Sequence, residues 1–209
     1  MNQVKVDTSW VRTWLVAMII SGCALQPAMP PVTDPTMRYT GIGYSALPPT
    51  GKDWYLKRHG PYALAFEKVS PGRFEGDHTF GAGVLVHLPE VKKVHSPAEF
   101  PKAVQELFTA RLTGVRFRLI SVKTVPFGPQ GSYCSQYDML QEERDNPIAP
   151  GIVLEITAHG FICLDTSSKY MINACYSERK PQGSKSFIDD ALKQEAEGFL
   201  RDIVVTPLR

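Results

Sequence analysis

One histidine, one aspartate and one cysteine in the second half of the chain could together support thiol chemistry. An imidazole oriented by a carboxylate can act as the base for a thiol nucleophile, so Cys175, His159 and Asp138 form a candidate set for a thiol-dependent hydrolase. However, Cys175 lies between Ala174 and Tyr176 in a strand-like run, whereas nucleophiles usually stand at a turn or a helix N-terminus. We therefore expect no catalytic residue and a structural role for this thiol, and the hydrolase stays the alternative.

The remaining two cysteines of this half lie on strand-like segments, residues 132–140 and 152–164. If these strands pair antiparallel, one register places Cys134 opposite Cys163, within disulfide range. The same register places the aspartate and the histidine named above opposite each other. We expect a disulfide between Cys134 and Cys163. A disulfide between Cys163 and Cys175 is the alternative, because connectivity cannot be deduced from sequence alone.

Metal and nucleic-acid chemistry find little support in the sequence. His78, His87 and His95 lie at intervals that fit no standard zinc pattern, so we expect no metal site and no cofactor. The formal net charge is +2 and no run of Lys or Arg occurs, which argues against nucleic acid as a partner.

The pattern of apolar residues predicts the elements that must position these side chains. A Ser-Pro-Ala-Glu capping box opens a helix over residues 96–112, and an apolar stripe predicts a second helix over residues 186–202. Runs of strands with one helix between them and one at the end predict an α+β domain, a mainly antiparallel sheet with both helices packed on one face. The expected strands cover residues 63–69, 79–87, 115–125, 132–140, 152–164 and 170–177.

The first 22 residues have the outline of a signal peptide. A polar segment with two basic residues, 1–13, precedes the seven-residue apolar run 14–20. A bilayer-spanning helix needs about 20 apolar residues, whereas the apolar core of a signal peptide needs only about 7–15.

The end of this segment, Ile20-Ser21-Gly22-Cys23, resembles the lipobox of bacterial lipoprotein precursors. The resemblance implies that Cys23 receives a diacylglyceryl group and becomes the first residue after cleavage. Ala24 follows, which in enterobacteria-like sorting implies the outer membrane, although that rule depends on lineage. There are two alternatives. The segment could be an ordinary signal peptide with an incidental cysteine, or it could be a buried N-terminal helix.

Residues 23–52 read as a tether, and residues 53–209 as a single domain. Ala24 to Arg38 contains four prolines and few large apolar residues, so it favours an extended chain of about 45 Å.

These features predict a lipoprotein of the cell envelope that acts by binding. Acylated Cys23 would hold it in the membrane, with the domain in the periplasm. An envelope protein, a glycan or a small ligand is the expected partner.

Overall fold

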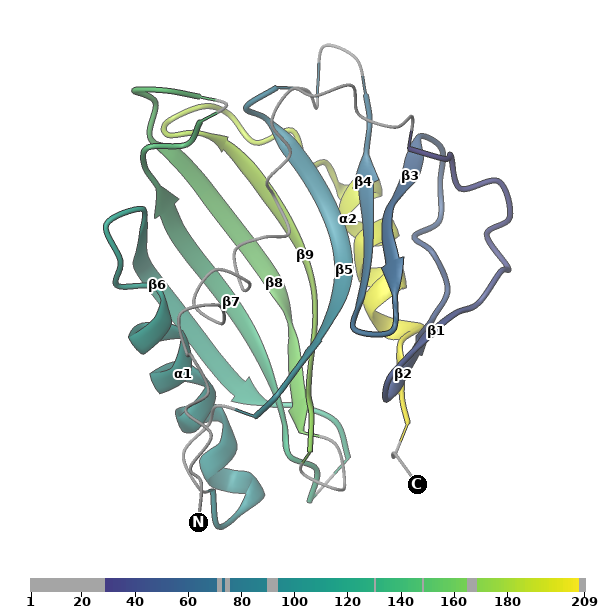
Figure 1. Ribbon diagram of the computed structural model, residues 1–209, viewed down its shortest axis with the longest axis vertical. Coiled ribbons are helices and arrows are strands. Elements are labelled where there is room, and N and C mark those ends of the chain that lie inside the picture. Colours follow the sequence, from purple (N-terminus) through teal and green to yellow (C-terminus); the bar gives the residue numbers. More distant parts are fainter. Residues whose placement is uncertain are drawn as a thin grey trace, which may run out of the picture.

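A seven-stranded antiparallel sheet forms the body of the protein (Figure 1). The computed structural model describes residues 29–206, apart from 71–72, 74–75, 90–93, 130, 148 and 165–168. The strand order is β3-β4-β5-β9-β8-β7-β6. The predicted α+β fold with a mainly antiparallel sheet is therefore confirmed. The strands are β3 (Trp54–Gly60), β4 (Ala63–Lys68), β5 (Thr79–His87), β6 (Phe117–Pro126), β7 (Cys134–Glu143), β8 (Leu154–Leu164) and β9 (Met171–Pro181).

Strands β7 and β8 pair in the register that the sequence predicts. Cys134 faces Cys163 and, four residues further along β7, Asp138 faces His159. The two cysteines are joined by a disulfide, with their Cα atoms 4.1 Å apart. The pairing follows from the alternation of side chains along each strand, because a slip of one residue would turn every side chain to the wrong face.

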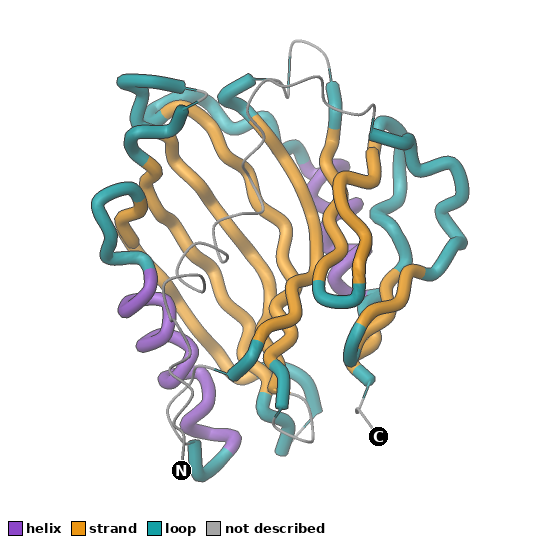
Figure 2. Tube along the Cα trace, viewed as in Figure 1, coloured by secondary structure: helices purple, strands orange, loops and turns teal. Residues whose placement is uncertain are grey.

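The two helices lie on opposite faces of the sheet, and the prediction that both pack on one face is wrong (Figure 2). Helix α1 (Phe100–Arg111) packs against one face, where Phe108 contacts Tyr137. Helix α2 (Asp190–Arg201) packs against the other, where Phe199 contacts Phe66. Strand β8 explains the error, because it buries apolar side chains on both faces and each face needs a cover.

The helix starts differ in how they are capped. The expected capping box is not formed, since the Ser96 side chain makes no cap hydrogen bond and the Glu99 carboxylate accepts from the His95 N–H, one residue earlier, at 3.2 Å. A 3-10 turn, Pro97–Glu99, precedes α1. At α2 the Asp189 carboxylate accepts from the Leu192 N–H at 2.8 Å, which satisfies a free donor of the first turn. Within the described ranges, no helix is long and apolar enough to cross a membrane.

Much of the segment expected to be a tether instead belongs to the domain. Strands β1 (Tyr39–Gly41) and β2 (Tyr44–Ala46) form a small antiparallel sheet with β10 (Val204–Val205). Tyr39, Tyr44 and Ala46 are buried in the core on the α2 side. The prolines misled the prediction, because the aromatic residues between them supply enough apolar surface to pack.

Candidate functional site

A row of four polar side chains crosses the α2 face of the sheet where the helix leaves it open. Lys123 of β6 pairs with Asp138 of β7, Asp138 pairs with His159 of β8, and His159 pairs with Tyr176 of β9. Directly opposed residues in neighbouring strands share a face, so the four side chains form one ladder. They line a groove of about 470 Å³.

Helix α2 and its entry segment form one wall of this groove. Ile188 and Lys193 line it from that side, opposite the hydroxyl groups of Ser121 and Thr157. The groove therefore combines an apolar surface with charged and hydroxyl-bearing groups at its edge, as ligand sites commonly do.

The centre of the ladder is a hydrogen-bonded imidazole. His159 Nδ1 lies 2.5 Å from an Asp138 carboxylate oxygen, and Nε2 lies 3.3 Å from the amide nitrogen of Gln136. If the Gln136 nitrogen donates to Nε2, then Nδ1 carries the ring proton and donates it to Asp138. The ring also contacts Tyr176, with the centroids 5.3 Å apart. Both ring nitrogens of His159 thus have partners, which fixes its orientation.

The hydroxyl of Tyr176 stays protonated at neutral pH. Burial, and then the negative charges of Glu197 and Asp138, raise the pKa of Tyr176 to about 12. The groove therefore offers a phenol donor beside a carboxylate acceptor.

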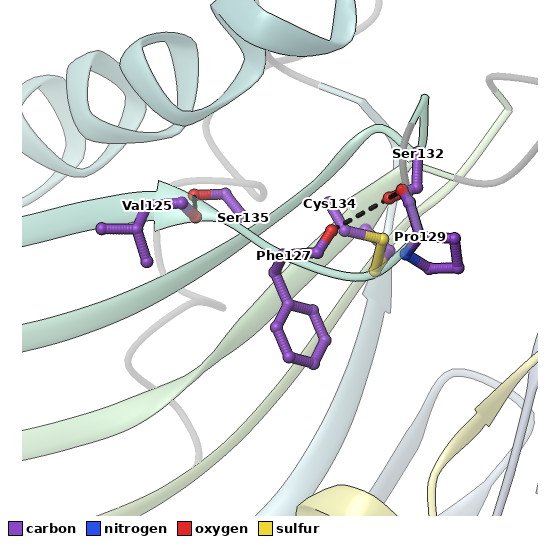
Figure 3. The surroundings of a disulfide bond; sticks show 7 residues. Val125, Phe127, Pro129, Ser132, Cys134 and Ser135 are labelled. Atoms are coloured by element: carbon purple, nitrogen blue, oxygen red, sulfur yellow. Dashed lines mark hydrogen bonds between the residues drawn. A yellow bond between two sulfur atoms is a disulfide. The ribbon is translucent and has the colours of Figure 1, made fainter.

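The disulfide lies on the same face of the sheet as the ladder, beside the turn that carries Phe127 (Figure 3). Phe127 stacks on Phe161 with the ring centroids 4.9 Å apart. The turn that carries Phe127 is closed by the Ser132 hydroxyl, which donates to the Phe127 carbonyl at 2.9 Å. The Cys134–Cys163 link thus ties β7 to β8 beside the ladder.

Cys175 does not join the Asp138–His159 pair. It precedes Tyr176 in β9, and consecutive strand residues point to opposite faces, so the thiol lies on the α1 face. There it is half-buried against the core beneath α1, and burial raises the pKa of the Cys175 thiol, although Tyr137 opposes this in part. The structure therefore separates the three residues that a Cys-His-Asp hydrolase would bring together.

Alkylation of the native protein is expected to leave Cys175 largely unmodified. A half-buried thiol with a raised pKa presents little thiolate at pH 7.5, so its reaction with iodoacetamide should be at least about tenfold slower than in the unfolded chain. Peptide mass spectrometry after native and denaturing labelling measures both rates. Rapid native labelling of Cys175 would contradict its structural role.

The three histidines considered for metal binding have separate surroundings. His78 Nε2 lies 2.8 Å from the buried Glu178 carboxylate, and His87 Nδ1 lies 3.1 Å from the Leu88 carbonyl. His95 is exposed before α1. Among the residues that the structure describes, no three His, Cys, Asp or Glu side chains are grouped as metal ligands would be.

His87 is expected to make folding sensitive to acid. Burial lowers the pKa of His87 to about 4. The hydrogen bond to the Leu88 carbonyl opposes this shift, and the positive charge of Arg111 adds to it. Its buried Nε2 has no hydrogen-bond partner. Between pH 6.5 and 4 the unfolded chain binds a proton that the folded chain does not, so stability falls as the pH falls through this window.

Replacing His87 with phenylalanine should remove this acid sensitivity. We expect the wild-type protein to lose about 3 kcal/mol more unfolding free energy than the His87→Phe variant between pH 7 and pH 4. Urea unfolding at a series of pH values measures the difference, and His95→Phe is the matched control on an exposed histidine. Parallel pH profiles for wild type and His87→Phe would refute the assignment.

The sequence predicted part of this site. The register placed Asp138 opposite His159, but Tyr176, Gln136 and Lys123 were not recognised as their neighbours. Pairing β9 with β8 in the same way would have found Tyr176. Cys23, the predicted lipidation site, lies outside the described residues.

Comparison with known proteins gives little further guidance. No family model matches the sequence, and no curated protein matches it. Among solved structures, the Saccharomyces cerevisiae Ran-binding protein Mog1p aligns with a TM-score of 0.43 at 12% identity, over 86% of this chain and 97% of that chain. A mutant Mog1 aligns with a TM-score of 0.42 at 11% identity, over 82% and 96% of the two chains. At this degree of similarity, nothing about binding is transferred to this chain.

Proposed function

We propose that this chain is a lipoprotein of the cell envelope that is anchored through acylated Cys23 and acts by binding a partner in the groove on the α2 face. Ile20-Ser21-Gly22-Cys23 supports the anchor, and Ala24 supports outer-membrane sorting with the domain in the periplasm. Two or more acyl chains give an almost permanent attachment, since each buried methylene contributes about 0.8 kcal/mol.

The surroundings of His159 carry the proposal that the site binds without catalysis. Its Nε2 faces the Gln136 amide, and Cys175, the nucleophile that the alternative hydrolase would need, lies on the other face of the sheet. An aspartate–histidine pair without a nucleophile at Nε2 is instead a fixed set of hydrogen-bonding groups. An envelope protein, a glycan or a small ligand could use these groups together with the Lys123 ammonium.

Photo-crosslinking in cells tests where the partner binds. We expect p-benzoylphenylalanine at Ser121, in the groove, to give a discrete adduct of defined mass, and the same probe at Thr109, on α1, to give none. Adding Asp138→Ala should reduce the Ser121 adduct at least about fivefold, because that change removes the carboxylate that orients His159. Equal adducts from both positions, or none from either, would contradict the proposed site.

A further inference from the structure

We infer that the lipidated protein stands on the membrane with the β3 edge of its sheet toward the bilayer and its groove away from it. This inference rests on the acylation of Cys23 proposed above. Its structural basis is the place where the described part of the chain first pairs with the domain. The Pro30 carbonyl accepts from the Leu56 N–H at 2.9 Å, and the Val32 N–H donates to the Trp54 carbonyl at 2.8 Å. Residues 30–32 therefore lie along the outer edge of β3.

The length of chain between the acylated cysteine and this edge limits how far the domain can stand from the membrane. Pro30 is the seventh residue after Cys23. A fully extended chain covers at most about 3.5 Å per residue, so Pro30 lies within about 25 Å of the bilayer surface. This is roughly half of the reach expected when residues 24–38 were taken as a free spacer.

So short a connection disfavours the inverted orientation. Strands β3 and β6 are the two edges of the seven-stranded sheet, and its six inter-strand spacings add up to about 29 Å along the curved sheet (Figure 1). If the β6 edge rested on the bilayer, the connection from Cys23 to Pro30 would have to be close to fully extended. The groove is lined by β6, β7, β8 and β9, so it faces the aqueous compartment.

The surface around the β3 side has the chemistry of a membrane-contacting surface. Tyr62, in the turn between β3 and β4, is 51% exposed, and Met37, just before β1, is 52% exposed. The Ile42 N–H donates to the Pro61 carbonyl at 2.8 Å, which holds the β1–β2 turn against the β3–β4 turn. Arg38 is exposed beside them. Tyrosine and methionine suit the headgroup boundary, and an arginine there attracts anionic lipid phosphates.

Depth-dependent quenching tests this orientation. The lipidated protein, carrying Cys175→Ser, would be reconstituted in phosphatidylethanolamine–phosphatidylglycerol vesicles that contain a headgroup nitroxide lipid. A bimane label on Tyr62→Cys should lose at least about half of its fluorescence. The same label on Val125→Cys, on the β6 edge, should lose less than about a tenth. Equal quenching at the two positions, or stronger quenching at Val125→Cys, would overturn the inference.

Two controls separate this inference from the proposal on which it rests. Intact mass of the same sample reports acylation, so an unacylated Cys23 would refute the anchor. An acylated protein that is quenched more strongly at Val125→Cys than at Tyr62→Cys would refute only the orientation. Inserting ten Gly/Ser residues between Cys23 and Pro30 extends the reach to about 60 Å. We expect the insertion to reduce the quenching difference by at least half, and an unchanged difference would show that chain length does not set the orientation.

Discussion

Replacing Gly160 with alanine is expected to destabilise the protein by about 3 kcal/mol or more. Gly160 lies in β8, opposite Cys175 of β9. A Cβ atom at this position would lie 2.1 Å from the Ala174 carbonyl oxygen and 2.7 Å from the Cys175 Cβ. Because the first of these atoms belongs to the backbone of a central strand, the clash can be relieved only by moving β9 itself.

Urea unfolding of the Gly160→Ala variant measures this effect, and Gly60→Ala is the matched control. Gly60 also lies in a strand, but a Cβ there meets nothing within 4 Å. We expect the control to change the unfolding free energy by less than about 1 kcal/mol. If Gly160→Ala has the same unfolding midpoint as the control, the close approach of β8 and β9 at this point is wrong.

Removing the Cys134–Cys163 disulfide is expected to be the other large perturbation. The bond closes a loop with a sequence separation of 29, so its loss should cost about 3.5 kcal/mol through the greater freedom of the unfolded chain. The double variant Cys134→Ala with Cys163→Ala, compared with the oxidised wild type in urea, gives the value.

The free cysteine provides the control for this experiment. Cys175→Ala removes a thiol of the same size but no crosslink, so it should cost clearly less than the double variant. Peptide mapping under non-reducing conditions must also find Cys134 joined to Cys163. A bond between Cys163 and Cys175, or a double variant as stable as wild type, would contradict the structure.

Local pairing could be predicted from the sequence because it depends on few residues. Cys134 with Cys163 and Asp138 with His159 satisfy one register, and a shift by a single residue would break both pairs. The helix α1 followed likewise from its apolar spacing. These features needed only the alternation of side chains along one or two segments.

The arrangement of the layers could not be predicted in the same way. Ile162 and Phe161 are neighbours in β8, and one packs under α1 while the other packs on the α2 side. A strand with both faces apolar does not say which helix covers which face. The packing of Tyr39 and Tyr44 was missed for a related reason, because Tyr39 packs on Phe66 and most other residues of their core cluster lie far away in the sequence.

The candidate site could be predicted only in part. Asp138 and His159 were found together, but their neighbours Tyr176 and Gln136 required the position of β9 and the direction of each side chain. The separation of Cys175 from the pair also depends on which way β9 presents its side chains. The direction of the Cys175 side chain in β9 therefore separates the two hypotheses, a thiol hydrolase and a binding groove.

Intact mass of the protein extracted from membranes tests whether Cys23 anchors it. We expect a chain that begins at Cys23 and carries a diacylglyceryl group, and we expect Cys23→Ala to accumulate as an uncut precursor without acyl mass. Ser21→Ala, which keeps a small residue in the lipobox, is the matched control and should be processed normally. An unacylated wild-type chain, or normal processing of Cys23→Ala, would contradict the anchor and the orientation that depends on it.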